Sequence, residues 1–428
     1  MLKLGGVKLF HFKNSKDAAT VELPLPSQVK IPLLQHMGAG CQPVVAVGER
    51  VLTGQLIGDS DAPMSVPVHS SVTGTVTAIE DYVAAGGRVE KQVVIQVDGE
   101  QEWFPSQPVE VHDQASLVAA ARAAGLAGLG GAGFPTHIKL AYKDIDRVDA
   151  LVINGAECEP YITSDYREMM EYPDDIIAGV ELVQRCLGIS RAYIGIEDNK
   201  PEAIQLLAGK LSGREDIRVE SLPSLYPQGA EKVLIYNTTG RIIEEGEIPA
   251  DKGVIVMNIT TVANLWRYVQ TGRPLTHKRV TVDGNFVKKP MNVRVPLGTS
   301  ISYLLEFAGV EMEKARKVLM GGPMMGMAVY QLDAPIIKNN NAILLLDEKE
   351  AEFPPTTACI RCGRCIGACP MNLMPAALER AYDQVDEETL KKLGVNLCIN
   401  CGSCSYVCPA KRHLAQKNQL AKGLLRKK

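Results

Sequence analysis

The feature that most constrains this chain is a run of four cysteines that occurs twice near its C-terminus. The runs read CIRCGRCIGACP and CINCGSCSYVCP, so both follow C-x2-C-x2-C-x3-C-P. Thiolates three positions apart can hold three corners of an iron–sulfur cube, and in two-cluster ferredoxins the fourth cysteine reaches the other cluster. The runs therefore predict two 4Fe-4S clusters, one held by Cys359, Cys362, Cys365 and Cys408, the other by Cys398, Cys401, Cys404 and Cys369.

A pair of structural zinc sites is the alternative. Zinc takes four ligands, typically grouped as two pairs, and gives no reason for a doubled run of four. Eleven cysteines would fit a disulfide framework only in a small secreted chain, whereas this one has 428 residues. Iron–sulfur ligation is the better prediction.

Composition and charge leave the fold open but narrow the class of partner. With 46% hydrophobic residues, the chain is long enough for several cored domains. The 46 basic and 49 acidic residues give a formal net charge of -3, so we expect no overall attraction to nucleic acid. The first residues lack the apolar core of a secretory signal, and no uninterrupted apolar run is long enough to span a membrane. We therefore expect a cytoplasmic protein that reaches a membrane only through partners.

The residues between the two cysteine runs predict helix. Leu378, Ala381, Tyr382 and Val385 recur at helical spacing, and Asp386 opens a second helical turn. Two clusters close together form a path for single electrons. Such a path needs an electron source elsewhere in the chain.

The most informative upstream stretch is AGLAGLGGAGFPTHIKLAYKD, at residues 124–144. Its glycines formally satisfy the dinucleotide fingerprint G-x-G-x-x-G, but that fingerprint follows a strand, whereas the preceding SLVAAARAAG has the composition of a helix. No Gly-Lys-Ser/Thr follows, which excludes a Walker loop. A glycine-rich loop that enters a helix near Thr136 still offers N–H groups to a phosphate, with a ligand-free turn as the alternative.

A strand is predicted next, at ALVINGAECEPY (residues 150–161), and it ends in a polar cluster of Asn154, Glu157 and Glu159. Together with GGAGFPT before it and AYIGIEDNKPEAI and VIVMNITTVANL after it, this segment resembles the flavin-binding 51-kDa subunit of respiratory complex I. The resemblance implies a Rossmann-like α/β domain that binds FMN and NADH.

The resemblance also implies a set of cofactor contacts, carried over position by position. The residues whose backbone would approach the FMN phosphate and ring are Gly128, Gly130 and Gly131. The residues that would hydrogen-bond the flavin are Lys139, Asn154, Asn258 and Thr261. The remaining members of the site are Phe134, stacked on a nucleotide ring, and the acids Glu157, Glu159, Glu197 and Asp198, the last three toward the NADH ribose or amide.

Two departures from the family pattern make FMN better supported than individual nicotinamide contacts. Ala156 stands where that family usually has an acidic residue, and Glu197 and Asp198 stand where it has two glutamates. Taken singly, each assigned residue has an ordinary alternative, Lys139 as a solvated helix residue and Phe134 as a core aromatic. The prediction rests on their joint occurrence in this order.

The first 110 residues predict a β-rich unit. Short strands separated by Gly and Asp turns are similar to the barrel-sandwich hybrid of lipoyl and biotinyl carriers. No lysine occurs between Arg50 and Lys91 to carry a swinging group, so we expect a docking module. His69, alone in a strand, is expected to be structural.

Residues 271–350 predict a second β-rich unit. Two strands around an Asp283-Gly284 turn and a helix capped near Thr299 are similar to an SLBB β-grasp domain. The LMGGPMMGMAVY that follows is expected to form a packed Gly-Pro turn with core methionines.

The order of these units is similar to that in the C subunits of Rnf complexes, the membrane-associated ferredoxin:NAD oxidoreductases. The resemblance predicts a multidomain α+β fold. Its parts are a barrel-sandwich hybrid at 1–110, an FMN/NADH domain at 111–270, an SLBB β-grasp domain at 271–350 and an α-helical two-cluster ferredoxin-like domain at 351–428.

This family implies an enzyme subunit that passes electrons between NAD(H), FMN and two 4Fe-4S clusters toward ferredoxin. Its partners would be the membrane subunits and the ferredoxin-interacting iron–sulfur subunit, at the cytoplasmic side of the cell membrane. Hydride transfer needs positioned rings rather than a side-chain acid or base, so no catalytic residue is assigned. Two alternatives stay open: a reductase like the cobalamin reductase of propanediol-utilising bacteria, and a non-catalytic electron-transfer subunit.

The C-terminal part of the sequence is basic. After Glu388 there is no Asp or Glu, and the basic residues there are Lys391, Lys392, Lys411, Arg412, Lys417, Lys422, Arg426, Lys427 and Lys428. We expect this end to dock on an acidic partner surface, with anionic lipid headgroups and simple solubility as alternatives.

Overall fold

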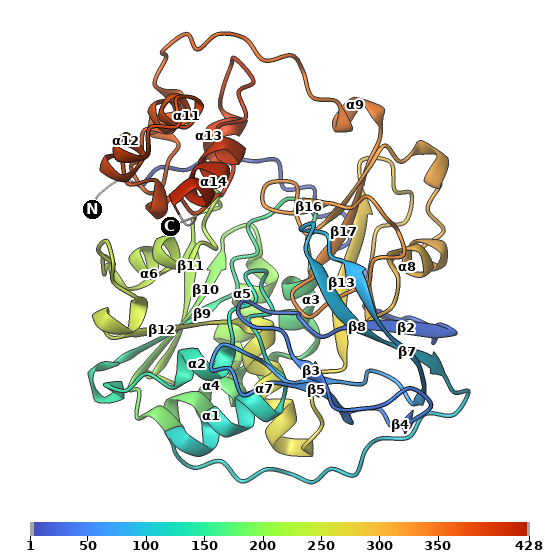
Figure 1. Ribbon diagram of the computed structural model, residues 1–428. Helices are drawn as coiled ribbons and strands as arrows, with labels where there is room; N and C mark the ends of the chain where they lie inside the picture. Colours follow the sequence, from blue (N-terminus) through green and yellow to red (C-terminus); the bar gives the residue numbers. More distant parts are fainter. Residues whose placement is uncertain (1–3, 426–428) are drawn as a thin grey trace.

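The computed structural model describes residues 4–425 and has a multidomain α+β architecture, as predicted (Figure 1). Separate hydrophobic cores form in the N-terminal β part, around the parallel sheet, under the mixed sheet and among the C-terminal helices. No helix within residues 4–425 is both long and apolar enough to cross a membrane. Three residues of the predicted basic end, Arg426, Lys427 and Lys428, lie outside the described residues.

The N-terminal part consists of two small antiparallel sheets, with strand orders β2-β8-β7-β4 and β3-β5-β6. Alternating apolar residues such as Val93 and Ile95 fill the space between them. The strands are β2 Gln28–Pro32, β3 Gln42–Pro43, β4 Arg50–Val51, β5 Leu56–Asp59, β6 Val68–His69, β7 Gly74–Val83 and β8 Val89–Val97.

The middle of the chain forms a four-stranded parallel sheet with the order β11-β10-β9-β12. ALVIN and VIVMN are nearly continuous apolar runs because helices cover both faces of the sheet (Figure 1). The strands are β9 Ala150–Asn154, β10 Arg191–Glu197, β11 Ile217–Leu222 and β12 Val254–Asn258. The helices are α1 Gln114–Ala123, α2 Thr136–Leu140, α3 Ser164–Glu171, α4 Pro173–Leu187, α5 Pro201–Lys210, α6 Glu231–Thr239 and α7 Ile259–Thr271.

The strand predicted at 150–161 is shorter than expected. It ends at Asn154, whose side-chain oxygen accepts a hydrogen bond from the N–H of Ala156 at 3.2 Å and so turns the chain out of the sheet. Asn154 pairs with Asn258 of β12, and Glu197 ends β10 at the same edge. The carboxyl ends of the strands therefore bring three predicted site residues together.

The next part is a mixed six-stranded sheet with the order β1-β14-β13-β17-β15-β16, with α8 packed in its core. The edge strand β1 comes from the start of the chain, ahead of the N-terminal β part. The N-terminal segment therefore contributes a strand to the mixed sheet before the chain enters that β part. The elements are β1 Val21–Glu22, β13 His277–Gly284, β14 Met291–Pro296, α8 Ile301–Phe307, β15 Lys317–Met320, β16 Met327–Ala328 and β17 Ala342–Leu346.

One detail of the prediction for this part is wrong. Asp283 and Gly284 are not a turn: they are the last residues of β13 and pair in parallel with β17, and residues 285–290 make the connection. The predicted helix cap near Thr299 is confirmed at the next residue, Ser300, whose hydroxyl accepts the N–H of Tyr303 at 3.2 Å.

The C-terminal part is helical, as predicted, and packs against the parallel-sheet part after a segment that crosses the top of Figure 1. Val385 does not join its core: α11 ends at Asp383, and Val385 is exposed with φ 53°. The helices are α9 Glu348–Ala351, α10 Arg364–Gly367, α11 Pro375–Asp383, α12 Glu387–Lys392, α13 Ser403–Tyr406 and α14 Leu414–Leu425.

Candidate functional site

The glycine-rich loop lies between α1 and α2, as the sequence predicts. Asn339 donates to the carbonyl of Gly131 at 2.8 Å, and the N–H of Met37 donates to the carbonyl of Gly133 at 2.8 Å. Thr261 accepts the N–H of Leu129 at 3.0 Å. The loop is thus fixed by residues from three other parts of the chain.

The loop leaves room and N–H groups for an anion. Within the part of the chain that the structure describes, the N–H groups of Gly130, Gly131 and Ala132 have no acceptor. Gly131 has φ 131° and open space where a side chain would be, a conformation that favours glycine. Successive free N–H groups form an anion-binding concavity, so these residues fit the phosphate of FMN.

Asn258 and Thr261 support this loop from β12 and α7. The side-chain oxygen of Asn258 caps α7 by accepting the N–H of Thr261 at 3.1 Å. Its amide nitrogen donates to Asp165 at 2.8 Å, and it lies so close to Gly130 that a side chain there would come within 2.9 Å of it. Both residues therefore lie beside the loop.

Lys139, Phe134 and Asn154 line the region next to the loop. Lys139 pairs with Glu231 of α6 at 2.6 Å and lies 5.9 Å from the centre of the Phe134 ring. The Asn154 amide donates to the carbonyl of Gly229 at 2.9 Å. Lys139 and Phe134 are near each other, Asn154 contacts the segment just before α6, and the contacts of all three with FMN stay a prediction.

The predicted acids are more engaged with the protein than the sequence suggests. Glu157 caps α3 by accepting the N–H of Asp165 at 2.7 Å, and Asp198 accepts the N–H of Ser224 at 3.1 Å. Glu197 is buried and pairs with Lys200 at 3.1 Å. Their roles toward NADH stay predictions.

Glu159 lies under the glycine-rich turn of the mixed-sheet part. It accepts the N–H groups of Met324 and Met325 at 3.0 and 2.9 Å, and burial raises its pKa to about 7. Gly322 has no side chain where the Glu159 carboxylate lies. The prediction of core methionines is wrong for Met325 and Met327, which are exposed, because this turn binds a carboxylate rather than filling a core.

Sequence reasoning missed Lys13, which holds the acidic segment from the N-terminal side. Its ammonium donates to the carbonyls of Glu157, Glu159 and Ile162 at 2.8, 2.9 and 2.6 Å. Burial lowers the pKa of Lys13 to about 8. No local pattern marks this lysine, since its acceptors are backbone atoms about 145 residues away.

The second cysteine set surrounds a single cavity. The cysteines that line it are Cys369, Cys398, Cys401 and Cys404, the four that crossed ligation assigns to one cluster. Among residues 4–425 no three His, Cys, Asp or Glu side chains converge as a single-ion site. Four thiols around a cavity suit a cluster, whose irons each take one thiolate, better than one zinc ion.

The two cysteine sets differ in their surroundings. Cys401 and Cys404 are buried, and the hydroxyl of Tyr226, from the parallel-sheet part, donates to the carbonyl of Cys401 at 2.7 Å. Cys359 and Cys362 are exposed. We call the set that lines the cavity the inner set (Cys369, Cys398, Cys401, Cys404) and the other one the outer set (Cys359, Cys362, Cys365, Cys408).

Neighbouring thiols also support the crossing of the fourth ligands. Burial raises the pKa of Cys369, and the nearby thiols of Cys401 and Cys398 raise it further. Burial raises the pKa of Cys365, and the thiol of Cys408 contributes in the same direction. Each fourth cysteine therefore lies near the other run.

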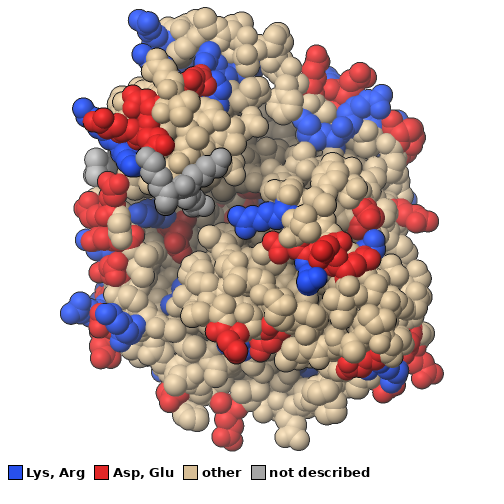
Figure 2. Space-filling model, viewed as in Figure 1, with Lys and Arg blue, Asp and Glu red and all other residues tan. Residues whose placement is uncertain are grey.

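Figure 2 shows acidic and basic side chains interspersed over one face of the molecule. On this face there is no continuous basic patch among the described residues, such as nucleic-acid-binding proteins present. The same face is hollowed between the C-terminal helices, at the upper left, and the parts below them.

Models of four known families match the chain in the predicted order. They are the RnfC barrel sandwich hybrid domain at residues 3–100, the Nuo51 FMN-binding domain at 121–267, the SLBB domain at 279–328 and the 4Fe-4S dicluster domain at 358–413. The C subunit of the proton-translocating ferredoxin:NAD(+) oxidoreductase complex of Clostridium ljungdahlii is 41% identical over 397 residues, 90% of this chain and 86% of the relative.

The chain belongs to the RnfC family. Another relative, the C subunit of the Na(+)-translocating ferredoxin:NAD(+) oxidoreductase complex of Acetobacterium woodii, is 39% identical over 369 residues, 84% of this chain and 83% of its own. A chain of an NAD+-reducing [NiFe]-hydrogenase in the H2-reduced state has a similar fold, with TM-score 0.50 and 19% identity over 72% of this chain and 60% of that chain.

These matches confirm several predictions about this member of the RnfC family. The fold class, the FMN-binding domain and the 4Fe-4S dicluster domain are as expected. The domain boundaries and the individual cofactor-binding residues stay predictions, which the geometry of the glycine-rich loop and of the inner set supports.

Proposed function

We propose that this chain is the NADH-facing electron-transfer subunit of an ion-translocating ferredoxin:NAD(+) oxidoreductase complex. The relatives from Clostridium ljungdahlii and Acetobacterium woodii are both named as the C subunit of such a complex. The chain combines an FMN-binding domain with a 4Fe-4S dicluster domain. It is therefore an oxidoreductase subunit with FMN, NAD(H) and two 4Fe-4S clusters as cofactors.

The observation that carries this proposal is the contact between the inner set and the flavin domain. Tyr226 donates to the Cys401 carbonyl and lies beside Glu159, which follows the strand of Asn154. Electrons therefore have a short protein path between the flavin region and the inner set. The exposed outer set is the exit toward a partner.

The residues of the flavin site bind and orient rather than react. The N–H groups of Gly130 and Gly131 would hold the phosphate, while Lys139 and Asn154 would orient the ring. When bound, FMN exchanges a hydride with NADH and single electrons with iron–sulfur clusters. No side chain of this chain needs to act as acid or base in that exchange.

The partners are the other subunits of the complex, both the membrane subunits and the iron–sulfur subunit that meets ferredoxin. Contact with the membrane would run through these partners, at its cytoplasmic side. The basic residues of the C-terminal part, such as Lys411, favour an acidic docking surface.

Anaerobic purification followed by iron, sulfide and flavin quantification tests the proposal. We expect about eight irons and about one FMN per chain, and loss of flavin absorbance on addition of NADH but much less with NADPH. Eight irons without flavin, or a flavin that NADH does not reduce, would contradict it. The chain would then carry electrons through its iron–sulfur clusters only, and another subunit would react with NADH.

A further inference from the structure

Lys278 is a buried lysine that reaches the glycine-rich loop from another part of the chain. It lies on β13 of the mixed sheet, and only 2% of its surface is exposed. Its ammonium donates to the carbonyl of Leu129, in the loop, at 3.0 Å. Lysines are rarely fully buried, because removing the charge from water is costly.

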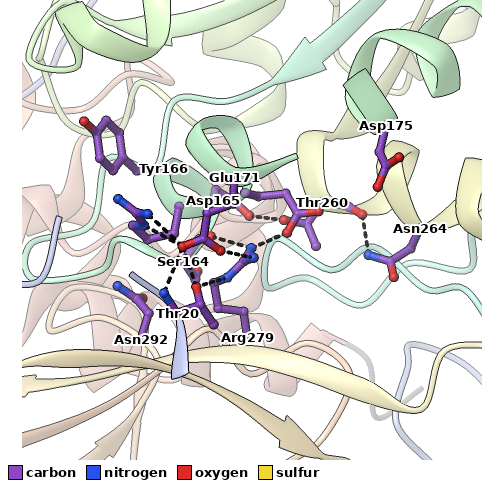
Figure 3. A network of polar contacts seen from close by, with 12 residues as sticks. Thr20, Ser164, Asp165, Tyr166, Glu171, Asp175, Thr260, Asn264, Arg279 and Asn292 are labelled. Atoms are coloured by element: carbon purple, nitrogen blue, oxygen red, sulfur yellow. Dashed lines mark hydrogen bonds and ion pairs between the residues drawn. The ribbon is translucent and has the colours of Figure 1, made fainter. Parts of the chain in front are cut away.

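The surroundings of Lys278 partly offset that cost. Burial lowers the pKa of Lys278 to about 8, while Asp165 and Glu168 oppose the shift. Figure 3 shows that Arg279, the next residue of β13, is held among acids of α3: it pairs with Glu171 at 2.9 Å and also with Glu168. Arg279 already neutralises those two acids, and the other acids that act on Lys278 are Asp165, whose effect is the larger, and Glu157.

Asp165 lies near both Lys278 and a residue that packs against the loop. Its two oxygens accept from Asn258 at 2.8 Å and from Thr260 at 2.6 Å. Asn258 lies against Gly130. Lys278 therefore contacts the loop through the Leu129 carbonyl, and Asp165 contacts the residue packed against Gly130.

Carbonyls along the loop are hydrogen-bonded by other parts of the chain, and so is the N–H of Leu129, which donates to Thr261, but the N–H groups at the tip of the loop are not. Lys278, Asn339 and the N–H of Met37 take up the carbonyls of Leu129, Gly131 and Gly133. The N–H groups of Gly130 to Ala132 remain without acceptors in residues 4–425. A loop held by its carbonyls presents its N–H groups to an anion without a further loss of conformational entropy on binding.

We propose that Lys278 is a positioning residue of the flavin site, holding the glycine-rich loop through Leu129 in the conformation that binds the FMN phosphate. The inference rests on the proposed function, because it assigns FMN to this loop. It makes the β-grasp part a direct contributor to flavin binding. Lys278 touches the loop and not the reacting atoms.

Lys278→Met and Lys278→Gln in the full-length protein test this role. Methionine matches the length of lysine but donates no hydrogen bond, whereas glutamine keeps an N–H donor without the charge. Lys289→Met is the matched control, since Lys289 is an exposed lysine of the same part of the chain. Each variant is measured for FMN dissociation constant, iron content and hydrogen exchange of the flavin-free protein.

We expect Lys278→Met to weaken FMN binding by about 10- to 100-fold, because a buried carbonyl loses its donor. Lys278→Gln should lose less, and Lys289→Met should bind as the wild type does. Iron content should stay unchanged in all three. Hydrogen exchange should rise in the peptide with residues 128–134 and not in the strands β9 and β12.

Several outcomes would overturn the inference. FMN affinity of Lys278→Met within about threefold of the wild type would do so, as would faster exchange throughout the protein, which indicates a merely structural lysine. If Lys278→Met does not fold, Lys278→Gln gives the same comparison. Wild-type protein that binds no FMN would instead contradict the proposed function, while the exchange of the loop still reports on Lys278.

Discussion

The inner and outer cysteine sets each contain three cysteines at the same spacing, but the two sets have opposite surroundings. Cys401 and Cys404 of the inner set are each 8% exposed, whereas Cys359 and Cys362 of the outer set lie in a stretch in which nearly every residue is exposed. Spacing determines which ligands can share a cluster. We expect packing to determine which cluster faces the flavin domain and which faces a partner.

The difference arises from what each run packs against. The run at residues 398–409 contacts Tyr226, Val7 and Met324, which come from three other parts of the chain. The run at residues 359–370 presents Ile360 and Ile366 to solvent. An exposed apolar surface around a redox centre suits a transient electron-transfer contact, which is small.

The largest expected effect separates the two sets by electron flow. Cys362→Ser and Cys401→Ser should each retain about four of about eight irons. In Cys362→Ser, NADH should still reduce the flavin and the remaining inner cluster. In Cys401→Ser, NADH should reduce the flavin but leave the outer cluster oxidised, because its connection is lost. Electron paramagnetic resonance after NADH addition measures the reduction of the remaining cluster in both variants.

The fourth cysteines provide the control for this comparison. With crossed ligation, Cys408→Ser should match Cys362→Ser in its remaining signal, and Cys369→Ser should match Cys401→Ser. Rapid reduction of the outer cluster by NADH in Cys401→Ser would show that the order of the clusters is wrong. Matching of Cys408→Ser with Cys401→Ser would show that the ligands do not cross.

The next largest effect is a pH dependence of stability caused by Glu159, which lies beside Tyr226 near the inner set. Its pKa is raised to about 7 from the usual 4.5, so between these values the folded state holds a proton that the unfolded state has lost. Stability should therefore fall as pH rises through this window, by roughly 3 kcal/mol. Glu159→Gln has no such proton, and its thermal midpoint should fall less than that of the wild type between pH 5 and 8.

The difference between wild type and Glu159→Gln isolates this carboxyl from other titrating groups. Lys13 and Lys278, whose pKa values are lowered by burial, change stability in the opposite direction and are common to both proteins. Equal slopes in the two proteins would mean that Glu159 is ionised in the folded state.

A smaller effect is expected for the hydroxyl that joins the inner set to the flavin domain. Tyr226→Phe leaves the Cys401 carbonyl without its donor. The free energy of unfolding should therefore fall by about 1–3 kcal/mol. The exposed Tyr406 gives the control, Tyr406→Phe. We expect the reduction potential of the inner cluster to change only in Tyr226→Phe, as measured by redox titration. An unchanged potential would limit Tyr226 to packing.

Sequence reasoning predicted what depends on spacing and local periodicity. The doubled cysteine run predicted the crossed sets, and the glycine-rich loop before Thr136 predicted an anion site, because both patterns act over a few residues. It could not predict contacts between distant segments. Lys278 beside Leu129, Lys13 beside Glu159 and the turn at Gly322 all join residues far apart in the chain, and no local pattern marks them.

The methionine-rich turn at residues 319–330 is a case in which a local pattern gave a wrong prediction, because distant contacts decide its structure. Apolar residues predict a core, yet the N–H groups of Met324 and Met325 bind Glu159 while the Met325 side chain is exposed. A backbone that binds a carboxylate has no side-chain signature beyond its glycines. Tertiary contacts decide such positions, so composition alone misassigns them.

The smallest effect on stability belongs to the outer surface. Arg361 and Arg364 are exposed beside the outer set, and no acidic residue occurs between Glu352 and Glu379. Replacing both arginines by Glu should change the free energy of unfolding by less than about 0.5 kcal/mol. It should nonetheless slow association with the partner subunits, most clearly at low salt, because exposed charges act on encounter rates.

Stopped-flow mixing of this protein with its partner subunits at several salt concentrations measures the association rate, with Lys289→Glu as an exposed control away from the outer set. If the double variant associates as fast as the control at low salt, the partner does not dock at the outer set, and the exposure of Cys359 and Cys362 has another cause.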